Sequence, residues 1–280
     1  MTTWAALIAQ ASGTLAQAGV PSPEVDAREL AEFACGARPA AAPAPSHAQI
    51  QAFEAAVAER AKRIPLQHIT GVMYFRYLTL ESRPGCFIVR PETELVAGEA
   101  IDAAKRSIEK DGRATVVDLC TGSGAIAISV ATEVPDAQVY AVEISPEACD
   151  LARANNIAHG NLVQVVQGDA LTACEELRGL VDVVVSNPPY VPAGVVHSPE
   201  VQQDPDLALW GGGEDGLEIP SALILRSTEL LAAGGILVME HAEEQAERLC
   251  HAALNAGFAT ARTGHDYTGR PRWLWAKLKG

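Results

Sequence analysis

Ala114-Thr-Val-Val-Asp118-Leu-Cys-Thr-Gly-Ser-Gly124 carries the clearest indication of the fold. It holds a short apolar run, a loop with two glycines, and then the apolar segment 125–131. This order predicts a buried strand followed by a helix. Glycine lets the backbone turn sharply and approach a ligand, and the start of a helix offers N–H donors without partners. The stretch therefore predicts a ligand-binding strand–loop–helix unit.

Similar apolar runs follow, and their ends carry polar residues. They end at Glu143, Asp169 and Asn187, and a further run extends from Gly235 to Glu240. Helical patterns between most of these runs predict an α/β fold with a mostly parallel sheet covered on both faces. Two extended segments around a turn in 258–279 predict an antiparallel C-terminal edge. Ligands of such sheets bind beyond the carboxyl ends of the strands, so the polar strand ends form the candidate site.

The N-terminal part has a different, helical pattern. Ser22-Pro23-Glu24 begins one helix and Gly36 ends it, and Ser46 with Gln49 forms a capping box for the next. Aromatic and β-branched residues between Leu66 and Val89 favour a hairpin. We therefore expect a helical domain over 1–65, a hairpin linker over 66–90 and the α/β domain over 91–280.

Composition narrows the class of protein. With 280 residues, 48% of them hydrophobic, the chain suffices for one α/β domain and a small companion. The formal charge of −14 argues against a nucleic acid as the direct substrate. The scattered cysteines predict reduced thiols and no metal site. No apolar run approaches the ~18 residues of a membrane span, and no signal peptide is apparent, so a cytoplasmic protein without a membrane partner is expected.

The acidic strand ends distinguish between two nucleotide cofactors. Gly122 to Ala127 fits the pattern G-x-G-x-x-A, and Glu143 lies 21 residues after Gly122, where a carboxylate accepts ribose hydroxyls. An NAD-dependent dehydrogenase shares these features. However, Asp118 would repel a pyrophosphate and would attract the α-ammonium group of S-adenosyl-L-methionine. Asp169 is suitably placed to accept from an adenine amino group, so S-adenosylmethionine is the expected cofactor.

Asn187-Pro188-Pro189-Tyr190 predicts the catalytic chemistry. An amide nitrogen is a poor nucleophile, because its lone pair is delocalised into the carbonyl. The side-chain oxygen of Asn187 and the carbonyl of Pro188 can accept the two N–H bonds of such an amide and direct its lone pair. The prolines stiffen the loop, and Tyr190 offers a flat face to a planar group. Catalysis by orientation and electrostatics follows, with no general base required.

A set of motifs along the chain resembles the HemK-type protein-(glutamine-N5) methyltransferases. The motifs are Pro65 to Gly71, Pro91-Glu-Thr-Glu94, Asp118 to Gly124, Ala-Val-Glu143, Ser186 to Tyr190, Asp204 to Gly216, and Asp266 to Arg270. The resemblance implies methylation of the glutamine in the Gly-Gly-Gln tripeptide of peptide-chain release factors. It further implies which residues line each site. The cofactor would meet Cys120, Thr121, Gly122, Ser123, Gly124, Glu143, Asp169, Ala170 and Asn187, and the glutamine would meet Asn187, Pro188, Pro189 and Tyr190.

Two departures and two rival functions accompany this resemblance. The family usually has Gly where Cys120 stands, and Ile-Pro-Arg-Pro where Ile88-Val-Arg-Pro91 stands. An adenine-N6 DNA or RNA methyltransferase would use the same Asn-Pro-Pro-Tyr pocket for a flipped base, but no basic target-reading segment is visible. A cofactor-sensing adaptor is disfavoured because the Asn-Pro-Pro-Tyr motif is intact. Because the pocket alone cannot distinguish one protein glutamine from another, the N-terminal helices are expected to recognise the protein substrate.

Overall fold

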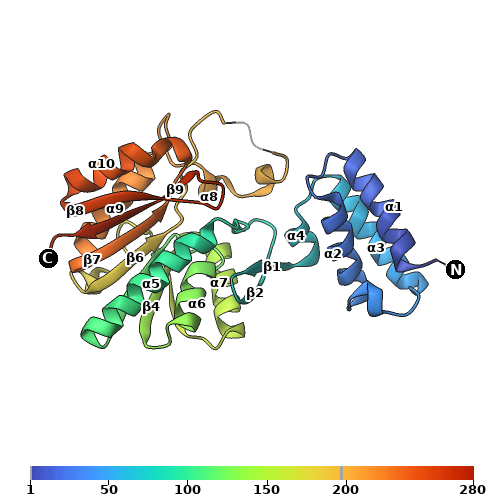
Figure 1. Ribbon diagram of the computed structural model, residues 1–280, viewed down its shortest axis with the longest axis horizontal. Helices are drawn as coiled ribbons and strands as arrows, with labels where there is room; N and C mark the ends of the chain where they lie inside the picture. Colours follow the sequence, from blue (N-terminus) through green and yellow to red (C-terminus); the bar gives the residue numbers. More distant parts are fainter. Residues whose placement is uncertain (1, 196–197) are drawn as a thin grey trace. The chain divides into compact units, whose positions relative to one another are not determined.

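The computed structural model describes residues 2–195 and 198–280, which form two compact units (Figure 1). The smaller unit holds the chain up to Val72 together with residues 82–84 and 198–203. The larger unit holds residues 73–81, 85–195 and 204–280. Each unit buries apolar side chains of its own.

The smaller unit is helical. Its elements are α1 (Trp4–Gln17), α2 (Pro23–Cys35), the 3-10 helix η1 (Pro39–Ala41), α3 (His47–Ala61), α4 (Leu66–Thr70) and the 3-10 helix η3 (Val201–Gln203). The predicted helix signals are confirmed: Ser46 and Gln49 cap α3 reciprocally, and Gly36 ends α2 in the left-handed conformation. Trp4 and Phe53 meet edge to face in the core, with ring centroids 6.0 Å apart.

A buried ion-pair cluster ties residues 198–203 to these helices. The Arg60 side chain is 5% exposed and contacts Asp26 at 2.6 Å and Glu200 at 2.9 Å. Arg63 contacts the same Glu200 carboxylate at 2.5 Å. Partial burial opposes ionisation of Glu200, but hydrogen bonds from Arg63 and Arg60 outweigh it and lower its pKa to about 2. A segment that follows the Asn-Pro-Pro-Tyr motif in sequence thus packs within the helical unit.

The segment expected to be one hairpin between 66 and 90 differs from that expectation. Residues 66–70 form α4, and its residues Leu66 and Ile69 pack on the helical core. Only β1 (Val72–Phe75) and β2 (Leu78–Glu81) form the hairpin, which lies largely in the larger unit. The physical reason is the position of the turn residues: Gly71 ends α4 in the left-handed conformation, and the turn at Pro84 and Gly85 follows β2.

The larger unit is built on a seven-stranded sheet of order β5-β4-β3-β6-β7-β9-β8. Its strands are β3 (Ala114–Leu119), β4 (Ala137–Glu143), β5 (Val163–Gln167), β6 (Val181–Ser186), β7 (Leu231–Glu240), β8 (Phe258–His265) and β9 (Pro271–Leu278). Strands β3 to β7 run parallel, and β9 lies antiparallel between β7 and β8. The predicted mostly parallel sheet with an antiparallel C-terminal edge is confirmed.

Helices cover both faces of this sheet (Figure 1). The helices of the larger unit are α5 (Thr93–Asp111), α6 (Ala125–Glu133), α7 (Pro146–Ala158), the short α8 (Asp206–Leu209), α9 (Glu218–Leu230) and α10 (Ala246–Ala256), with short 3-10 turns η2 (Glu175–Leu177) and η4 (Glu243–Gln245). Alternate residues of a strand enter opposite cores: Val116 packs with α5 and α6, whereas Val117 packs with α9 and α10. Among the described helices, none has the length and apolar character that crossing a membrane demands.

Candidate active site

The site lies where the strand order of the sheet reverses direction. Strand β3 pairs in parallel with β4 on one side and with β6 on the other. At its carboxyl end Leu119 is in register with Ser186, whose hydroxyl donates a 2.6 Å hydrogen bond to the Leu119 carbonyl. The loops that follow β3 and β6 therefore start side by side, as ligand sites in open α/β sheets require.

The loop after β3 is shaped by left-handed backbone. Cys120, Gly122 and Gly124 have φ values of 63°, 58° and 86°. A Cβ added to Gly124 would lie 2.9 Å from the Ile128 side chain, so glycine permits close packing of the helix start there. A Cβ added to Gly122 would meet nothing within 4 Å, so the loop surface is open at that point. The left-handed backbone at Cys120 also explains why the family that the sequence resembles usually has glycine at this position.

Asp118 lies beneath this loop. Its side chain is completely buried, and Oδ2 accepts hydrogen bonds from the Thr121 hydroxyl at 2.5 Å and from the Ala127 N–H at 3.2 Å. Within the described chain, Oδ1 is buried without a hydrogen-bond partner. Burial raises the pKa of Asp118 to about 7 despite these two hydrogen bonds. A cationic group bound above the loop would favour the ionised carboxylate.

Glu143 and Asp169 occupy the ends of the neighbouring strands. Glu143 is 7% exposed, and its two oxygens accept from the Gly122 N–H at 2.8 Å and the Ser145 N–H at 2.9 Å. Because a carboxylate has about four acceptor positions, these bonds leave lone pairs for two hydroxyls. Asp169 lies two residues beyond the end of β5 and is exposed, with Oδ1 accepting from the Leu171 N–H at 2.9 Å.

These groups fit S-adenosylmethionine. The buried, unpartnered Asp118 Oδ1 suits a cationic ligand, Glu143 suits a ribose, and the open surface at Gly122 admits close approach of a ligand. Cys120 does not act as a thiolate here, because burial and the carboxylates of Glu143 and Asp118 raise the pKa of its thiol. Among the remaining predicted contacts, Thr121 and Ser123 are buried within the loop and Ala170 is half-buried after β5.

The loop after β6 presents acceptors instead. Pro188 and Pro189 are buried, whereas Asn187 and Tyr190 are half-buried. The Asn187 side-chain Nδ2 donates to the Thr93 hydroxyl oxygen at 3.4 Å. Neither Asn187 Oδ1 nor the Pro188 carbonyl accepts a hydrogen bond from another described residue. The two acceptors predicted for a substrate amide thus have no hydrogen-bond donor among the residues that the structure describes.

Glycines of the Asp204–Gly216 motif pack closely against the Asn187–Tyr190 loop, which we call the catalytic loop. A Cβ on Gly211 would lie 2.8 Å from the Tyr190 Cα, and one on Gly216 would lie 2.3 Å from the Tyr190 carbonyl oxygen. Gln245 donates to that same carbonyl at 2.8 Å. The backbone at Tyr190 is therefore fixed by close packing that only glycine permits. The motif supplies this packing, a role that the sequence did not reveal.

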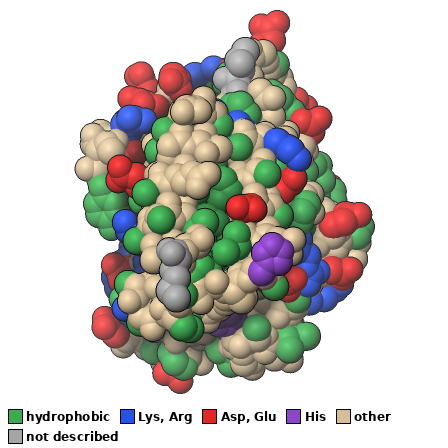
Figure 2. Space-filling view, turned by 90° about the vertical axis from the view of Figure 1, so that its right-hand side faces the viewer, with side chains coloured by type: hydrophobic (Ala, Val, Ile, Leu, Met, Phe, Trp, Pro, Cys, Tyr) green, Lys and Arg blue, Asp and Glu red, His purple; other side chains and the backbone are tan. Residues whose placement is uncertain are grey.

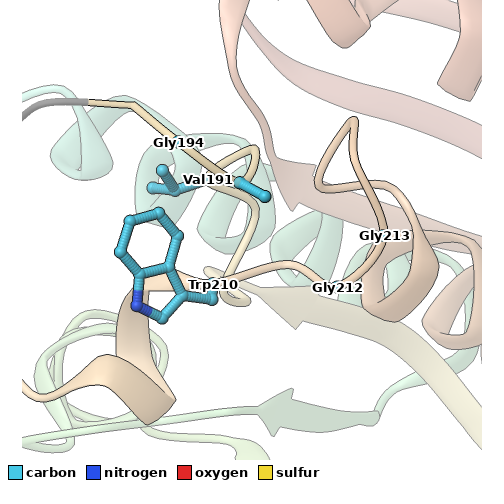
Figure 3. Close-up of a pocket in the computed structure, with 6 residues that line it drawn as sticks. Val191, Gly194, Trp210, Gly212 and Gly213 are labelled. Carbon is cyan, nitrogen blue, oxygen red and sulfur yellow. The ribbon is translucent and has the colours of Figure 1, made fainter.

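A hollow of about 330 Å³ opens immediately after Tyr190. It is lined by Val191, Ala193, Gly194, Trp210, Gly212 and Gly213. Figure 3 shows the Trp210 indole next to Val191 at this hollow, and the two residues also pair as an isolated bridge between their segments. The lining is largely apolar side chain and backbone.

One further polar residue near the catalytic loop, Glu240, was not assigned by sequence reasoning. Glu240, at the end of β7, is completely buried and accepts from the Tyr190 hydroxyl at 3.0 Å. Burial raises its pKa to about 7, although Thr93 and Tyr190 hydroxyls lower it. The available signal was the apolar run 236–239 ending in a carboxylate, a fifth polar strand end.

Arg90, whose role the sequence left open, pairs with the buried carboxylate of Asp204. The guanidinium also lies over the Phe87 ring, 4.9 Å from its centroid. Asp204 Oδ1 accepts in addition from the Ile88 N–H at 3.2 Å. Arg90 therefore anchors the start of the Asp204–Gly216 motif, and this contact gives it a structural role.

Comparisons with known proteins agree with this geometry. Residues 98–204 match the family described as methyltransferase small domain, and residues 6–71 match the PrmC N-terminal domain. Release factor glutamine methyltransferases from Bifidobacterium longum and Streptomyces coelicolor are 43% and 45% identical, each over 96% of this chain and 98% and 96% of their own. A 4-amino-L-phenylalanine/4-methylamino-L-phenylalanine methyltransferase from Streptomyces pristinaespiralis is 39% identical over 87% of this chain and 84% of its own.

Solved structures share the fold of the larger unit. A methyltransferase from Pyrococcus furiosus matches with a TM-score of 0.52 at 19% identity, over 72% of this chain and 88% of its own. A 16S rRNA methyltransferase from T. thermophilus, solved with AdoMet and guanosine, has the same score and identity over 74% of this chain and 50% of its own. The near-full-length relatives, with the matching methyltransferase domain, show that the chain belongs to the release factor glutamine methyltransferase family of S-adenosylmethionine-dependent enzymes.

Proposed function

We propose that this chain transfers a methyl group from S-adenosylmethionine to the side-chain N5 of the glutamine in the Gly-Gly-Gln motif of peptide-chain release factors. The observation that carries the proposal is the pair of unpartnered acceptors, Asn187 Oδ1 and the Pro188 carbonyl, beside the cofactor loop. Two acceptors match the two N–H bonds of a primary amide. The printed names of the relatives support the same substrate.

When bound, S-adenosylmethionine supplies an electrophilic methyl group on a sulfonium centre. Asn187 and Pro188 would hold both N–H bonds of the glutamine amide and so direct the face of its nitrogen, which carries the lone pair, toward the methyl group. The buried prolines and the packed backbone at Tyr190 keep the acceptors in place, so little reorganisation is needed as charge develops on the nitrogen. The proton of the methylated amide leaves to water, so no residue of the chain need act as a general base.

The helical unit is proposed to recognise the protein substrate, because a glutamine amide by itself carries no information on which protein it belongs to. Phe33 and Val25 of α2 are 49% and 47% exposed, so both side chains are open to contact with a partner. Phe33→Ser is expected to raise KM for a release factor about five- to ten-fold, as loss of an apolar interface anchor does. The matched control is Leu254→Ser, an equally exposed residue of α10.

A nucleic-acid substrate is the second candidate, and charge disfavours it. On the face shown in Figure 2, Lys and Arg side chains lie scattered among acidic ones rather than gathered in a patch. The formal charge of the chain is −14. A small aromatic amine is the third, suggested by the printed name of one relative. The hollow beside Tyr190 favours a peptide, since it offers room for residues that flank the glutamine.

Transfer of labelled methyl groups separates these substrates. The full-length chain is incubated with a release factor, its Gln→Ala variant in the Gly-Gly-Gln motif, 4-amino-phenylalanine and double-stranded DNA, and products are mapped by mass spectrometry. We expect label on the release factor at that glutamine alone. Label on the Gln→Ala factor, or faster transfer to the amine or DNA, contradicts the proposal.

A further inference from the structure

A buried asparagine of α7 connects the β1–β2 hairpin to the loop that follows β3. Asn155 is 1% exposed, and its Oδ1 accepts from the Glu81 N–H at 2.8 Å. Its Nδ2 donates to the Glu81 carbonyl at 3.3 Å and to the Ser123 carbonyl at 3.0 Å. Asn155 therefore joins the last residue of β2 to the Cys120–Gly124 loop.

This bond to Ser123 lies at a point of the loop that the neighbouring strand does not hold. The part next to β4 is held by the Gly122 N–H, which donates to Glu143 at 2.8 Å. The bonds of α6 begin with the Gly124 carbonyl, which accepts the first helical N–H at 2.9 Å. The Ser123 carbonyl lies between these two parts and accepts from Asn155 in a buried hydrogen bond. Helix α7 thus holds the loop at a second point.

The three partners of Asn155 require a side-chain amide. One partner is an N–H donor and the other two are carbonyl acceptors, so the side chain must supply an acceptor and two hydrogens together. Asparagine supplies both, whereas an ionised aspartate of the same size has only acceptors. An aspartate would place an oxygen against the Ser123 carbonyl. The contact therefore depends on chemistry that packing alone does not require.

We propose that Asn155 is a positioning residue for S-adenosylmethionine, which holds Ser123 and so keeps the loop in the conformation that presents its open backbone at Gly122. A loop with two glycines loses much conformational freedom when it is ordered, and ordering it before the ligand arrives removes that cost from binding. The inference deepens the proposed function and rests on it for the assignment of the Cys120–Gly124 loop to the cofactor, but not for the identity of the methyl acceptor.

Asn155→Asp tests this role without a change of volume, because it removes both donated hydrogen bonds and keeps the side-chain shape. We expect the dissociation constant for S-adenosylmethionine, measured by calorimetry, to rise about five- to twenty-fold, the size of one or two lost neutral hydrogen bonds. The kcat at saturating S-adenosylmethionine should fall by a smaller factor, since the catalytic loop is not altered. An unchanged dissociation constant in the folded variant overturns the proposal.

The next residue of the helix is a matched control. Asn156 is 3% exposed, donates from Nδ2 to the Val163 carbonyl at 2.8 Å and to Asn161 Oδ1 at 3.0 Å, and accepts from the Val163 N–H at 3.0 Å. Val163 begins β5, whereas the site lies at the carboxyl ends of the strands. Asn156→Asp should lower the melting temperature about as much as Asn155→Asp and leave cofactor affinity nearly unchanged. Equal losses of affinity would reduce the effect to general destabilisation and overturn the proposal.

Side-chain NMR of the wild type gives a test that does not require any variant to fold. Binding of S-adenosylmethionine should shift the Asn155 NH2 resonances and slow their hydrogen exchange, because it suppresses local opening of the loop. The Asn156 NH2 resonances should respond much less. An equal response of the two side chains, or none from Asn155, contradicts the positioning role.

Glu143→Ala separates a failure of this inference from a failure of the cofactor assignment. If Glu143→Ala weakens S-adenosylmethionine binding and Asn155→Asp does not, the positioning role alone is wrong. If neither variant weakens binding, the Cys120–Gly124 loop is not the cofactor site, and the inference falls with that assignment. Because each measurement uses S-adenosylmethionine without a methyl acceptor, neither result depends on the release factor.

Discussion

The loops after β3 and β6 start side by side on neighbouring parallel strands but are held by different means. The Cys120–Gly124 loop is shaped by its own left-handed residues and presents backbone to a ligand. The Asn187–Tyr190 loop is fixed from outside by Thr93, Glu240, Gln245 and two distant glycines. The shape of the first loop is therefore largely local, apart from its contact with Asn155, whereas the second loop depends on tertiary contacts. Binding of the cofactor and holding of the reacting amide should consequently be separable by mutation.

The largest expected effect concerns the second loop. Asn187→Ala should lower kcat about 10²- to 10³-fold, as removal of one preorganised polar partner does, and leave the affinity for S-adenosylmethionine nearly intact. The kcat of Tyr190→Ala should lie between that of Asn187→Ala and that of the wild type, because other contacts can partly replace stacking on the Tyr190 ring. Single-turnover kinetics and calorimetry measure the two quantities. Equal losses in kcat and in affinity for S-adenosylmethionine would contradict the separate roles of the two loops.

The first loop should show the reverse pattern. Glu143→Ala should weaken S-adenosylmethionine binding about ten- to a hundred-fold, since it removes a charged acceptor. It also leaves the N–H groups of Gly122 and Ser145 without their acceptor, so some loss of stability accompanies it. Glu143→Gln, which retains an acceptor, should lose less. Calorimetric titration of the folded variants decides, and an unchanged dissociation constant would contradict the ribose assignment.

Asp118 makes the first loop sensitive to pH. Its folded pKa is raised by burial from 3.8 to about 7, so its contribution to stability is complete below about 4 and is lost as pH rises through 7. The Glu240 carboxyl changes the stability in the same direction, because burial raises its pKa from 4.5 to about 7. We expect the ligand-free protein to lose unfolding free energy between pH 5 and 8, at up to about 1.4 kcal/mol per pH unit for each of the two groups.

Urea unfolding at several pH values measures this loss. Asp118→Asn should flatten the dependence, and saturating S-adenosylmethionine should reduce it, because a nearby cation favours the carboxylate. A steeper dependence in Asp118→Asn would show that another group carries the effect. Equal protection by the cofactor at pH 5 and pH 8 would show that its cation does not interact with Asp118.

The smallest effect belongs to Cys120. Its φ of 63° costs a non-glycine residue about 1–2 kcal/mol, whereas glycine gains chain entropy of about 0.5–1 kcal/mol in the unfolded state. Cys120→Gly should therefore stabilise the protein by less than about 1 kcal/mol and preserve cofactor binding. Cys120→Val, which places a β-branched residue in the same conformation, should destabilise it. Thermal unfolding of both variants tests the sign, and equal melting temperatures would contradict the strain.

Much of the fold could be predicted because its signals are local. The apolar runs indicated the parallel strands, the glycine loop and acidic strand ends indicated the cofactor, and the capping box indicated α3. The family could be predicted as well, because each of its motifs consists of neighbouring residues. The Leu66–Val89 segment was predicted less well, because a five-residue helix ended by Gly71 has too few residues to show a helical period.

The α/β fold, the cofactor and the Asn-Pro-Pro-Tyr chemistry could thus be predicted from short motifs along the chain, since each motif consists of neighbouring residues. The contacts that hold the Asn-Pro-Pro-Tyr loop in place became clear only from the folded chain. Asn187 bonds Thr93 of α5, and Tyr190 bonds Glu240 of β7, and no spacing along the chain indicates either contact. The attachment of residues 198–203 to the helical unit through Arg60 could likewise not be predicted from the sequence. The physical reason is that a hydrogen bond between buried side chains depends on strand order and helix packing, which hydrophobic periodicity does not encode.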